Sequence, residues 1–295
     1  LVQIRDIKPD YLYLNSMYST CFTIYPLLMK RLGMIKGQVV LAPRGMLKST
    51  AVQYKTGKKQ LFFKLLKWLR VQKQIIFHAT DATEETDIRN LFGKDVTIKQ
   101  ITNFPPQQKA LQIINKQSGA IKIIFVGRVH PIKNLSFLLT CLQTITAKVQ
   151  LTIVAAIEDE AYWIKCGDII NNLTERVTVK LQQDIPHHQI EQLINNHHLF
   201  VLPTLGENFG HAIFEALSAG RPVLISDQTP WRNLQEYYAG WDLSLSDEAA
   251  FVRVLQQVAA MDDEAYQQWS TGAWQYAKNF TESSDLKEKY KELFS

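Results

Sequence analysis

Residues 200–227 read FVLPTLGENFGHAIFEALSAGRPVLISD, and this stretch decides the fold of the second half of the chain. It begins inside a short apolar run at residues 199–202, which predicts a buried strand. A helical pattern then carries Glu215 and ends at Gly220, where a C-terminal cap belongs. A second apolar run at 222–225 predicts another buried strand. The order strand, loop, helix, strand is typical of a parallel α/β sheet.

The loop and the helix of this stretch contain groups that can hold an anion. Gly210 lies where the helix is predicted to begin, and the first backbone N–H groups of a helix lack partners and form its positive end. Glu215 falls on a polar stripe of the helix, separate from the apolar stripe of Ile213, Phe214 and Leu217. Taken alone, Glu207 and Glu215 also fit an ordinary solvated surface.

A second group of candidate residues follows the strand predicted at 121–126, where the sequence continues GRVHPIKN. Open α/β sheets bind ligands beyond the ends of such strands. Gly127 lets a backbone approach a ligand closely, and Arg128 and Lys133 add two cations, so the loop suits a diphosphate. The same residues also fit an ordinary basic surface loop.

Together these motifs resemble those of a known family. Glu207, the Asn-Phe-Gly turn, Glu215 and the continuation EALSAGRPVL resemble the Glu-x7-Glu signature of the retaining GT-B glycosyltransferases of family 4. Residues 127–134 resemble that family's GRxxxxKN segment. The resemblance extends over essentially the whole chain and is strongest at residues 119–234. It implies an α/β GT-B fold, in which two Rossmann-like domains with parallel sheets face each other across a cleft, the first domain being incomplete.

The resemblance also implies roles for the candidate residues. Arg128 and Lys133 contact the diphosphate of a nucleotide-sugar donor and stabilise charge on the leaving group. Glu215 accepts hydrogen bonds from the ribose hydroxyls, and Glu207 lies beside the donor sugar. The predicted catalytic residues are therefore Arg128, Lys133 and Glu207. The remaining predicted donor-binding residues are Gly127, Asn208, Phe209, Gly210, His211 and Ala212.

The first half of the chain offers further candidates at the ends of two predicted strands. Asn15 follows the strand predicted at 11–14, and Arg44 and Gly45 follow the strand predicted at 38–42. Arg44 stands where many relatives carry histidine, and an arginine cannot act as a base at neutral pH. These three residues are predicted to contact the acceptor or the donor, and no catalytic base is assigned.

Strand and helix patterns alternate through both halves, which predicts two domains. With 295 residues, 46% of them hydrophobic, the chain has material for two cores. We predict a partial acceptor-side domain at 1–104, a linker at 105–118, a nucleotide-sugar-binding domain at 119–278, and a final helix at 279–295 that returns to the first domain. The chain begins with Leu1, and the family's opening strand and glycine-rich loop are expected to be missing.

The composition narrows the cellular setting and the cofactors. Three widely spaced cysteines without a Cys-x-x-Cys pair suit a reducing cytoplasm, and no apolar run approaches the roughly 20 residues that cross a bilayer. The histidine pairs at 187–188 and 197–198 lack companion ligands and are predicted to have surface or cap roles. No Asp-x-Asp is present, so we expect neither a metal nor another cofactor.

A basic segment suggests contact with an anionic partner. Nine basic and no acidic residues lie between Arg44 and Lys73. Between Lys55 and Lys73, cationic and apolar residues alternate at helical spacing, which fits an amphipathic helix on the inner face of the cell membrane. The alternative is a surface helix whose apolar face packs on the sheet. Nucleic-acid binding is not expected, because the segment lacks a recognition motif.

The predicted function is that of a retaining glycosyltransferase. It would move a sugar from a UDP-, GDP- or ADP-linked donor to a glycan or lipid-linked acceptor, in the synthesis of bacterial surface polysaccharide or lipopolysaccharide. Two alternatives remain open at this point. One is a GT-B-fold sugar-nucleotide epimerase or hydrolase, and the other is a non-catalytic, membrane-associated partner that binds nucleotide sugars.

Overall fold

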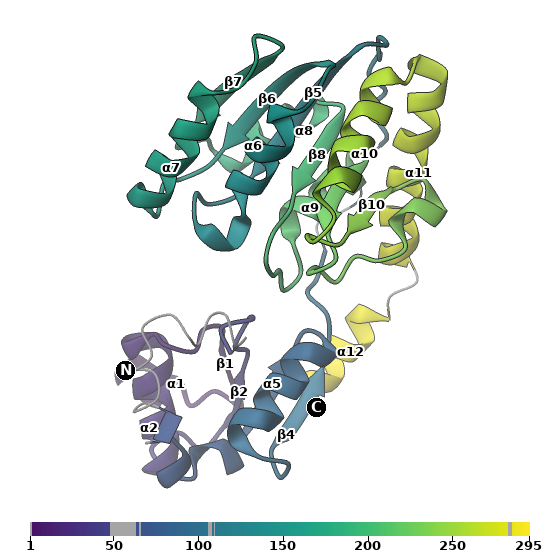
Figure 1. Cartoon of the computed structure of the whole chain (residues 1–295). Coiled ribbons are helices and arrows are strands. Elements are labelled where there is room, and N and C mark those ends of the chain that lie inside the picture. The colour runs from purple at the N-terminus through teal and green to yellow at the C-terminus, as the bar shows by residue number, and fades with distance from the viewer. Residues whose placement is uncertain (1, 48–62, 65, 106–107, 109, 283–284) are drawn as a thin grey trace. The chain divides into compact units, whose positions relative to one another are not determined.

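The chain folds into two compact units, each with its own parallel sheet (Figure 1). The computed structural model describes residues 2–47, 63–64, 66–105, 108, 110–282 and 285–295. We call Leu1–Phe104 together with Asp285–Ser295 unit 1, and Pro105–Ser284 unit 2.

Unit 1 is built on a four-stranded parallel sheet whose strands lie side by side in chain order. The strands are β1 (Tyr11–Leu14), β2 (Gln38–Leu41), β3 (Ile75–Ala79) and β4 (Thr97–Gln100). The helical elements are α1 (Val2–Ile7), η1 (Thr20–Ile24), α2 (Tyr25–Arg31), η2 (Val71–Lys73), α5 (Ala82–Phe92) and α12 (Leu286–Leu293). Leu41 and Phe77 from the central strands are buried against Ile88 of α5. Because the strands are parallel, the loops that follow β1, β2 and β3 meet at one edge of the sheet.

The strands predicted at 11–14 and 38–42 are confirmed to within one residue. Residues 55–62 and 65 of the predicted basic helix lie outside the described residues. In its described part, Phe63 and Leu66 are buried in the core of unit 1, whereas Trp68 is 78% exposed. The apolar side of this segment therefore packs on the core, as the alternative interpretation proposed. None of the described helices has the length and apolar character needed to cross a bilayer.

Unit 2 has a six-stranded parallel sheet with the strand order of a Rossmann fold, β10-β9-β8-β5-β6-β7. The strands are β5 (Ala120–Val126), β6 (Lys148–Val154), β7 (Val177–Gln182), β8 (Leu199–Leu202), β9 (Val223–Ser226) and β10 (Gly240–Leu243). The helical elements are η3 (Pro131–Lys133), α6 (Leu135–Gln143), α7 (Glu160–Asn171), α8 (His187–Asn195), α9 (His211–Ser218), η4 (Leu234–Tyr237), α10 (Glu248–Ala260) and α11 (Asp263–Glu282). Every residue of β8 and β9 is buried, which explains why these strands read as continuous apolar runs.

The strand order of unit 2 reverses between β5 and β8, which are neighbours in the sheet. After β5 the chain turns towards β6, and after β8 it turns towards β9 on the other side. The two loops that follow these strands therefore lead to opposite sides at the carboxyl edge of the sheet, the place where open α/β folds bind ligands. Both groups of candidate residues from the sequence lie on these two loops.

The predicted surface role was wrong for His197 and His198, which are 7% and 8% exposed. The predicted cap role is confirmed for His197, whose Nδ1 atom lies 2.5 Å from the carbonyl oxygen of Leu193 in the last turn of α8. Each histidine is held by hydrogen bonds inside unit 2. The Nδ1 atom of His198 accepts the backbone N–H of Lys122 at 3.0 Å, and its Nε2 atom lies 3.3 Å from the carbonyl oxygen of Asn115. An imidazole whose Nδ1 atom accepts a backbone N–H is neutral. Burial lowers the pKa of His198 to about 4.

Acidification is therefore expected to destabilise unit 2 through His198. The unfolded chain takes up this proton near pH 6.5, and the folded chain only near pH 4. The contribution of neutral His198 to the free energy of unfolding is thus fully present above pH 6.5. It is lost as the pH falls towards 4, by roughly 3 kcal/mol at most. Urea unfolding of His198→Asn at several pH values should show a shallower dependence on pH than the wild type. His188→Asn, at an exposed histidine, should keep the wild-type dependence.

Candidate functional site

The loop after β5 is held close to the sheet by backbone hydrogen bonds. The N–H of Gly127 donates to the carbonyl of Val154 at 3.0 Å, and the N–H of Val129 donates to that of Ala156 at 2.8 Å. A Cβ atom on Gly127 would lie 3.6 Å from Cγ of Lys133, which is an ordinary contact. The fold itself therefore does not demand glycine at 127, and the predicted close approach of a ligand remains the reason offered for it.

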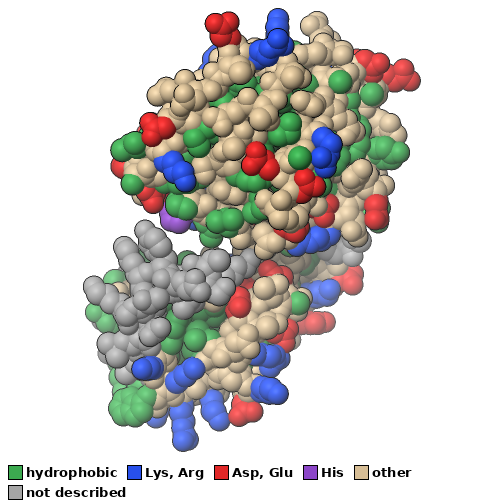
Figure 2. Space-filling model, viewed as in Figure 1, with side chains coloured by type: hydrophobic (Ala, Val, Ile, Leu, Met, Phe, Trp, Pro, Cys, Tyr) green, Lys and Arg blue, Asp and Glu red, His purple; other side chains and the backbone are tan. Residues whose placement is uncertain are grey.

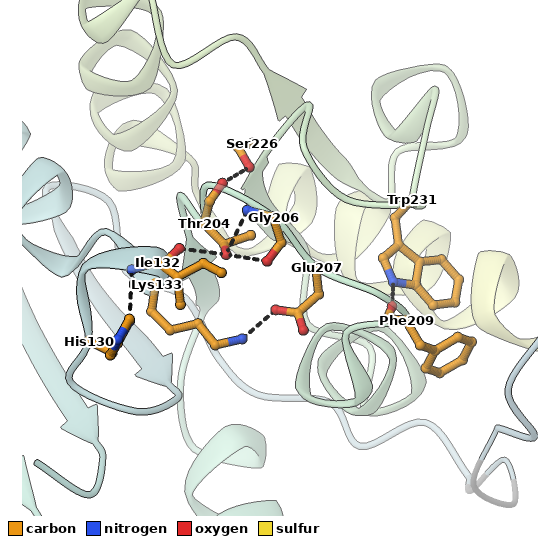
Figure 3. Close-up of polar contacts among 9 residues, drawn as sticks. All are labelled: His130, Ile132, Lys133, Thr204, Gly206, Glu207, Phe209, Ser226 and Trp231. Carbon is orange, nitrogen blue, oxygen red and sulfur yellow. Dashed lines mark hydrogen bonds and ion pairs between the residues drawn. The ribbon is translucent and has the colours of Figure 1, made fainter. Parts of the chain in front are cut away.

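Thr204, the second residue after β8, connects the loops that follow β5 and β8 (Figure 3). Its side-chain hydroxyl is fully buried and lies 2.9 Å from the carbonyl oxygen of Ile132 and 3.0 Å from that of Gly206. Its own carbonyl accepts the hydroxyl of Ser226, at the end of β9, at 2.5 Å. Thr204 thus ties the loop after β5 to the ends of β8 and β9. Thr204 carried no predicted role, although a hydroxyl two residues beyond a buried strand lies at the edge where such sheets bind ligands.

Lys133 and Glu207 form an ion pair between the two loops (Figure 3). The Nζ atom of Lys133 lies 2.5 Å from Oε2 of Glu207, and the two side chains are only 14% and 16% exposed. Their residues lie 74 positions apart in the sequence. Lys133, which is predicted to bind the diphosphate, and Glu207, which is predicted to lie beside the donor sugar, are thus in direct contact at the switch point of the sheet.

Gly210 is required by the turn that leads into α9. Its φ angle is +77°, and a Cβ atom there would lie 2.8 Å from Cδ1 of Ile213 and 3.0 Å from Cγ of Glu207. A side chain would therefore both strain the backbone and displace the ion-pairing glutamate. Helix α9 begins at His211, next to Glu207 and the ion pair, as the sequence predicted. It ends at Gly220, whose φ is +70°, with the paired hydrogen bonds of a Schellman cap.

The remaining residues of the predicted turn divide between core and surface. Asn208 and Ala212 are half-buried and His211 is exposed, whereas the Phe209 ring is 3% exposed. The carbonyl of Phe209 accepts the indole N–H of Trp231 at 2.6 Å, and Trp231 itself is 3% exposed (Figure 3). Phe209 can thus present only backbone groups to a ligand. Trp231 is therefore a packing residue.

Glu215 and Arg128 each have a partner that the sequence did not reveal. Oε1 of Glu215 lies 3.1 Å from Nε2 of His187, the first residue of α8, and Glu215 is 16% exposed. Arg128 is 56% exposed and donates from Nη1 to Glu158 at 2.7 Å. Arg128 and Lys133 therefore share one loop but pair with different carboxylates. Among the described residues, no cluster of His, Cys, Asp and Glu could hold a metal ion.

The three candidates of unit 1 also lie together, at the carboxyl edge of its sheet. Arg44 donates from Nε to Oδ1 of Asn15 at 2.7 Å and from Nη2 to the hydroxyl of Tyr13 at 2.8 Å. The N–H of Gly45 donates to Glu84 at 2.5 Å. Arg44 has a φ of +55°, a left-handed backbone that costs a non-glycine residue about 1 kcal/mol. Such strain is concentrated at functional sites.

Comparison with known proteins shows what the second unit and the fold are similar to. Residues 120–260 match the family described as Glycosyl transferases group 1. Three solved structures resemble the whole chain or most of it. HepE from Anabaena, in complex with UDP and glucose, has a TM-score of 0.72 at 16% identity over 99% of this chain and 79% of its own. Sucrose-phosphate synthase from Thermosynechococcus elongatus has a TM-score of 0.72 at 17% identity over 99% and 76%. TarM from S. aureus has a TM-score of 0.64 at 18% identity over 88% and 51%.

At these identities, the structural matches show the fold alone, and the family model matches less than half of the chain. No curated protein sequence matches the chain. The predicted α/β fold with two parallel sheets is confirmed. The chain therefore has the GT-B fold of glycosyltransferases, and residues 120–260 of its second unit match the glycosyl transferases group 1 family, which supports a transferase.

Proposed function

We propose that this chain is a retaining glycosyltransferase that moves a sugar from a nucleoside diphosphate to a glycan or lipid-linked acceptor in the synthesis of bacterial surface polysaccharide. The observation that supports this most is the Lys133–Glu207 ion pair, which lies beside the start of α9 at the switch point of unit 2. A cation, a carboxylate and a helix N-terminus are the groups needed to hold a diphosphate and the sugar attached to it.

Each group of this site has a distinct task in the proposed reaction. Lys133 stabilises the charge that develops on the leaving diphosphate, and Arg128 supports it from the same loop. Glu207 accepts hydrogen bonds from hydroxyls of the donor sugar. The first N–H groups of α9 face the distal phosphate. With two cations and a helix terminus available, the leaving group needs no metal, and transfer should persist in EDTA.

Both cations of the site are paired with carboxylates. Lys133 pairs with Glu207, and Arg128 pairs with Glu158. A diphosphate that binds here competes for these ammonium and guanidinium groups. When Lys133 turns towards the phosphate, Glu207 loses its ionic partner and becomes available to the sugar hydroxyls. The pair thus keeps both groups in place in the absence of the donor.

A panel of donors tests the proposal. Thermal shift with UDP, GDP and ADP sugars identifies the stabilising nucleotide, because a ligand that binds the folded state raises the transition temperature. Product analysis by NMR with that donor then gives the configuration at the anomeric carbon. Transfer with retention supports the proposal. Inversion, free sugar or an epimerised nucleotide sugar in place of transfer would contradict it.

Glu215→Ala is expected to weaken binding of the stabilising nucleotide by roughly 10- to 100-fold, because a carboxylate that accepts from two ribose hydroxyls is lost. Calorimetry with the nucleotide and with its 2′,3′-dideoxy analogue isolates this contact. The analogue should bind wild type and variant equally. Glu264→Ala, at an exposed glutamate on α11, is the matched control and should leave affinity unchanged. An equal loss of affinity for both nucleotides would show that Glu215 does not contact the ribose hydroxyls.

A lipid-linked acceptor would bring the chain to the inner face of the cell membrane. Trp68 is 78% exposed, and Lys64, Lys67 and Arg70 around it are exposed as well. Figure 2 shows further Lys and Arg side chains on the visible face of unit 1. We propose peripheral contact of this region with anionic lipid. Sedimentation with vesicles that contain or lack phosphatidylglycerol tests it, and equal recovery with both would contradict it.

A further inference from the structure

The turn after β2 has an unusual backbone and is held by a buried carboxylate. Arg44 and Gly45 both have left-handed φ angles, +55° and +74°, and the N–H of Met46 closes the turn on Pro43 at 3.2 Å. Glu84, from the first turn of α5, is only 1% exposed. Its Oε1 accepts the N–H of Gly45 at 2.5 Å, so the carboxylate fixes the turn that carries Arg44.

The second oxygen of Glu84 is occupied as well. Oε2 accepts both the backbone N–H and the hydroxyl of Thr80, at 2.8 and 2.7 Å. The carboxylate is therefore used to shape the loops after β2 and β3. Among the described residues, no carboxylate forms an ion pair with Arg44, whose charge is not neutralised by a neighbour of this kind.

A chain of hydrogen bonds orients the guanidinium of Arg44. Its Nη2 donates to the hydroxyl of Tyr13, which lies 2.6 Å from Nδ1 of His78. Nε2 of His78 lies 2.7 Å from the carbonyl of Ile101, and a carbonyl only accepts, so Nε2 carries the proton and Nδ1 accepts from Tyr13. Burial lowers the pKa of His78 to about 4 and raises that of Tyr13 to about 12. Tyr13 and His78 are therefore neutral at pH 7 and do not offset the positive charge of the guanidinium.

One edge of this guanidinium still lacks an acceptor. Nε is bound to Asn15 and Nη2 to Tyr13, whereas Nη1 is buried and has no hydrogen-bond partner among the described residues. Buried polar groups in native proteins are nearly always paired, and a charged donor more so than a neutral one. A fixed, uncompensated cation with a donor left over, at the ligand-binding edge of a parallel sheet, fits an anionic ligand.

We propose that Arg44 binds an oxyanion carried by the acceptor, either the carboxylate of a uronic acid or a phosphate. This inference rests on the proposed function only for the source of the anion, and the anion site itself is a property of unit 1. Asn15 and Tyr13 are positioning residues that hold the fork of the guanidinium towards the ligand. The acceptor of this enzyme is then a charged sugar or a phosphorylated carrier, and a neutral sugar is a poor substitute.

Titration of the full chain with three small probes, followed by NMR, tests the anion site directly. Methyl glucuronide and glycerol phosphate represent the two anions, and methyl glucoside is the neutral comparison. At least one anion should bind wild type 10-fold or more tightly than the glucoside does. A preference for the glucuronide assigns a sugar carboxylate, and a preference for glycerol phosphate assigns a phosphate. Equal binding of all three probes would overturn the proposal.

Two substitutions connect this binding to Arg44. Arg44→Asn keeps a residue that tolerates the left-handed backbone and should reduce anion affinity to that of the neutral probe. Asn15→Ala frees Nε without altering the turn and should cause a smaller loss. Arg31→Gln removes an exposed arginine of the same unit and should change nothing. Unchanged anion binding in Arg44→Asn would refute the assignment. Nucleotide binding, measured in the same samples, reports separately on the donor site and the proposed function.

Discussion

Lys133→Ala is expected to lower kcat/KM for sugar transfer about 10²- to 10³-fold, the usual effect of removing one preorganised group that stabilises charge in the transition state. The Nζ atom of Lys133 is fixed by a 2.5 Å contact in a site that is mostly closed to water, where a positive charge acts strongly. Because the charge on the diphosphate grows as the sugar departs, the loss should fall mainly on kcat. Release of nucleotide diphosphate under steady-state conditions measures it.

The ion pair makes a second explanation testable, namely that Lys133 acts only by holding Glu207. A double-mutant cycle with Lys133→Ala and Glu207→Gln separates the two roles. If Lys133 only positions Glu207, the double variant should be no slower than Glu207→Gln alone. If Lys133 stabilises the leaving group, the double variant should be slower by a further factor of 10 or more. Lys148→Ala, an exposed lysine at the start of β6, is the matched control and should retain wild-type rates.

The sequence was informative where local pattern and tertiary structure agree. Fully buried parallel strands require continuous apolar residues, so β8 and β9 were visible as uninterrupted runs. Gly210 and Gly220 marked the two ends of α9, because both adopt left-handed backbones. Since strands and helices alternate, the sequence alone places the loops after β5 and β8 at the ligand-binding edge of a parallel sheet.

Partners that come from distant loops could not be predicted in this way. Glu158 lies 30 positions from Arg128, and His187 lies 28 positions from Glu215, and no spacing rule connects either pair. His198 was misjudged because its surroundings are contributed by the segment around Asn115, which packs over it from far away in the sequence. The Arg44 turn is a similar case. Its carboxylate, Glu84, looked like an ordinary first-turn residue of a helix.

Trp231→Ala is expected to destabilise unit 2 by about 3–5 kcal/mol, the typical cost of removing a large buried aromatic side chain. The indole lies in a cluster of rings, with centroids 5.2 Å from Phe209, 5.7 Å from Phe214 and 4.9 Å from Phe280. Urea unfolding with and without the stabilising nucleotide measures the effect. The transition that shifts with nucleotide belongs to the unit that binds it. Trp68→Ala, at a 78% exposed tryptophan, should change stability by less than about 0.5 kcal/mol.

Trp231→Phe separates packing from the hydrogen bond and connects the cluster to the site. Phenylalanine keeps most of the ring contacts but cannot donate to the carbonyl of Phe209, which precedes Gly210 and the start of α9. The buried carbonyl then lacks its partner, at a cost of about 1–3 kcal/mol. Because this carbonyl lies in the turn after Glu207, nucleotide affinity should fall together with stability. Loss of stability with unchanged nucleotide affinity would show that the aromatic cluster supports the core of unit 2 and leaves the binding turn unaffected.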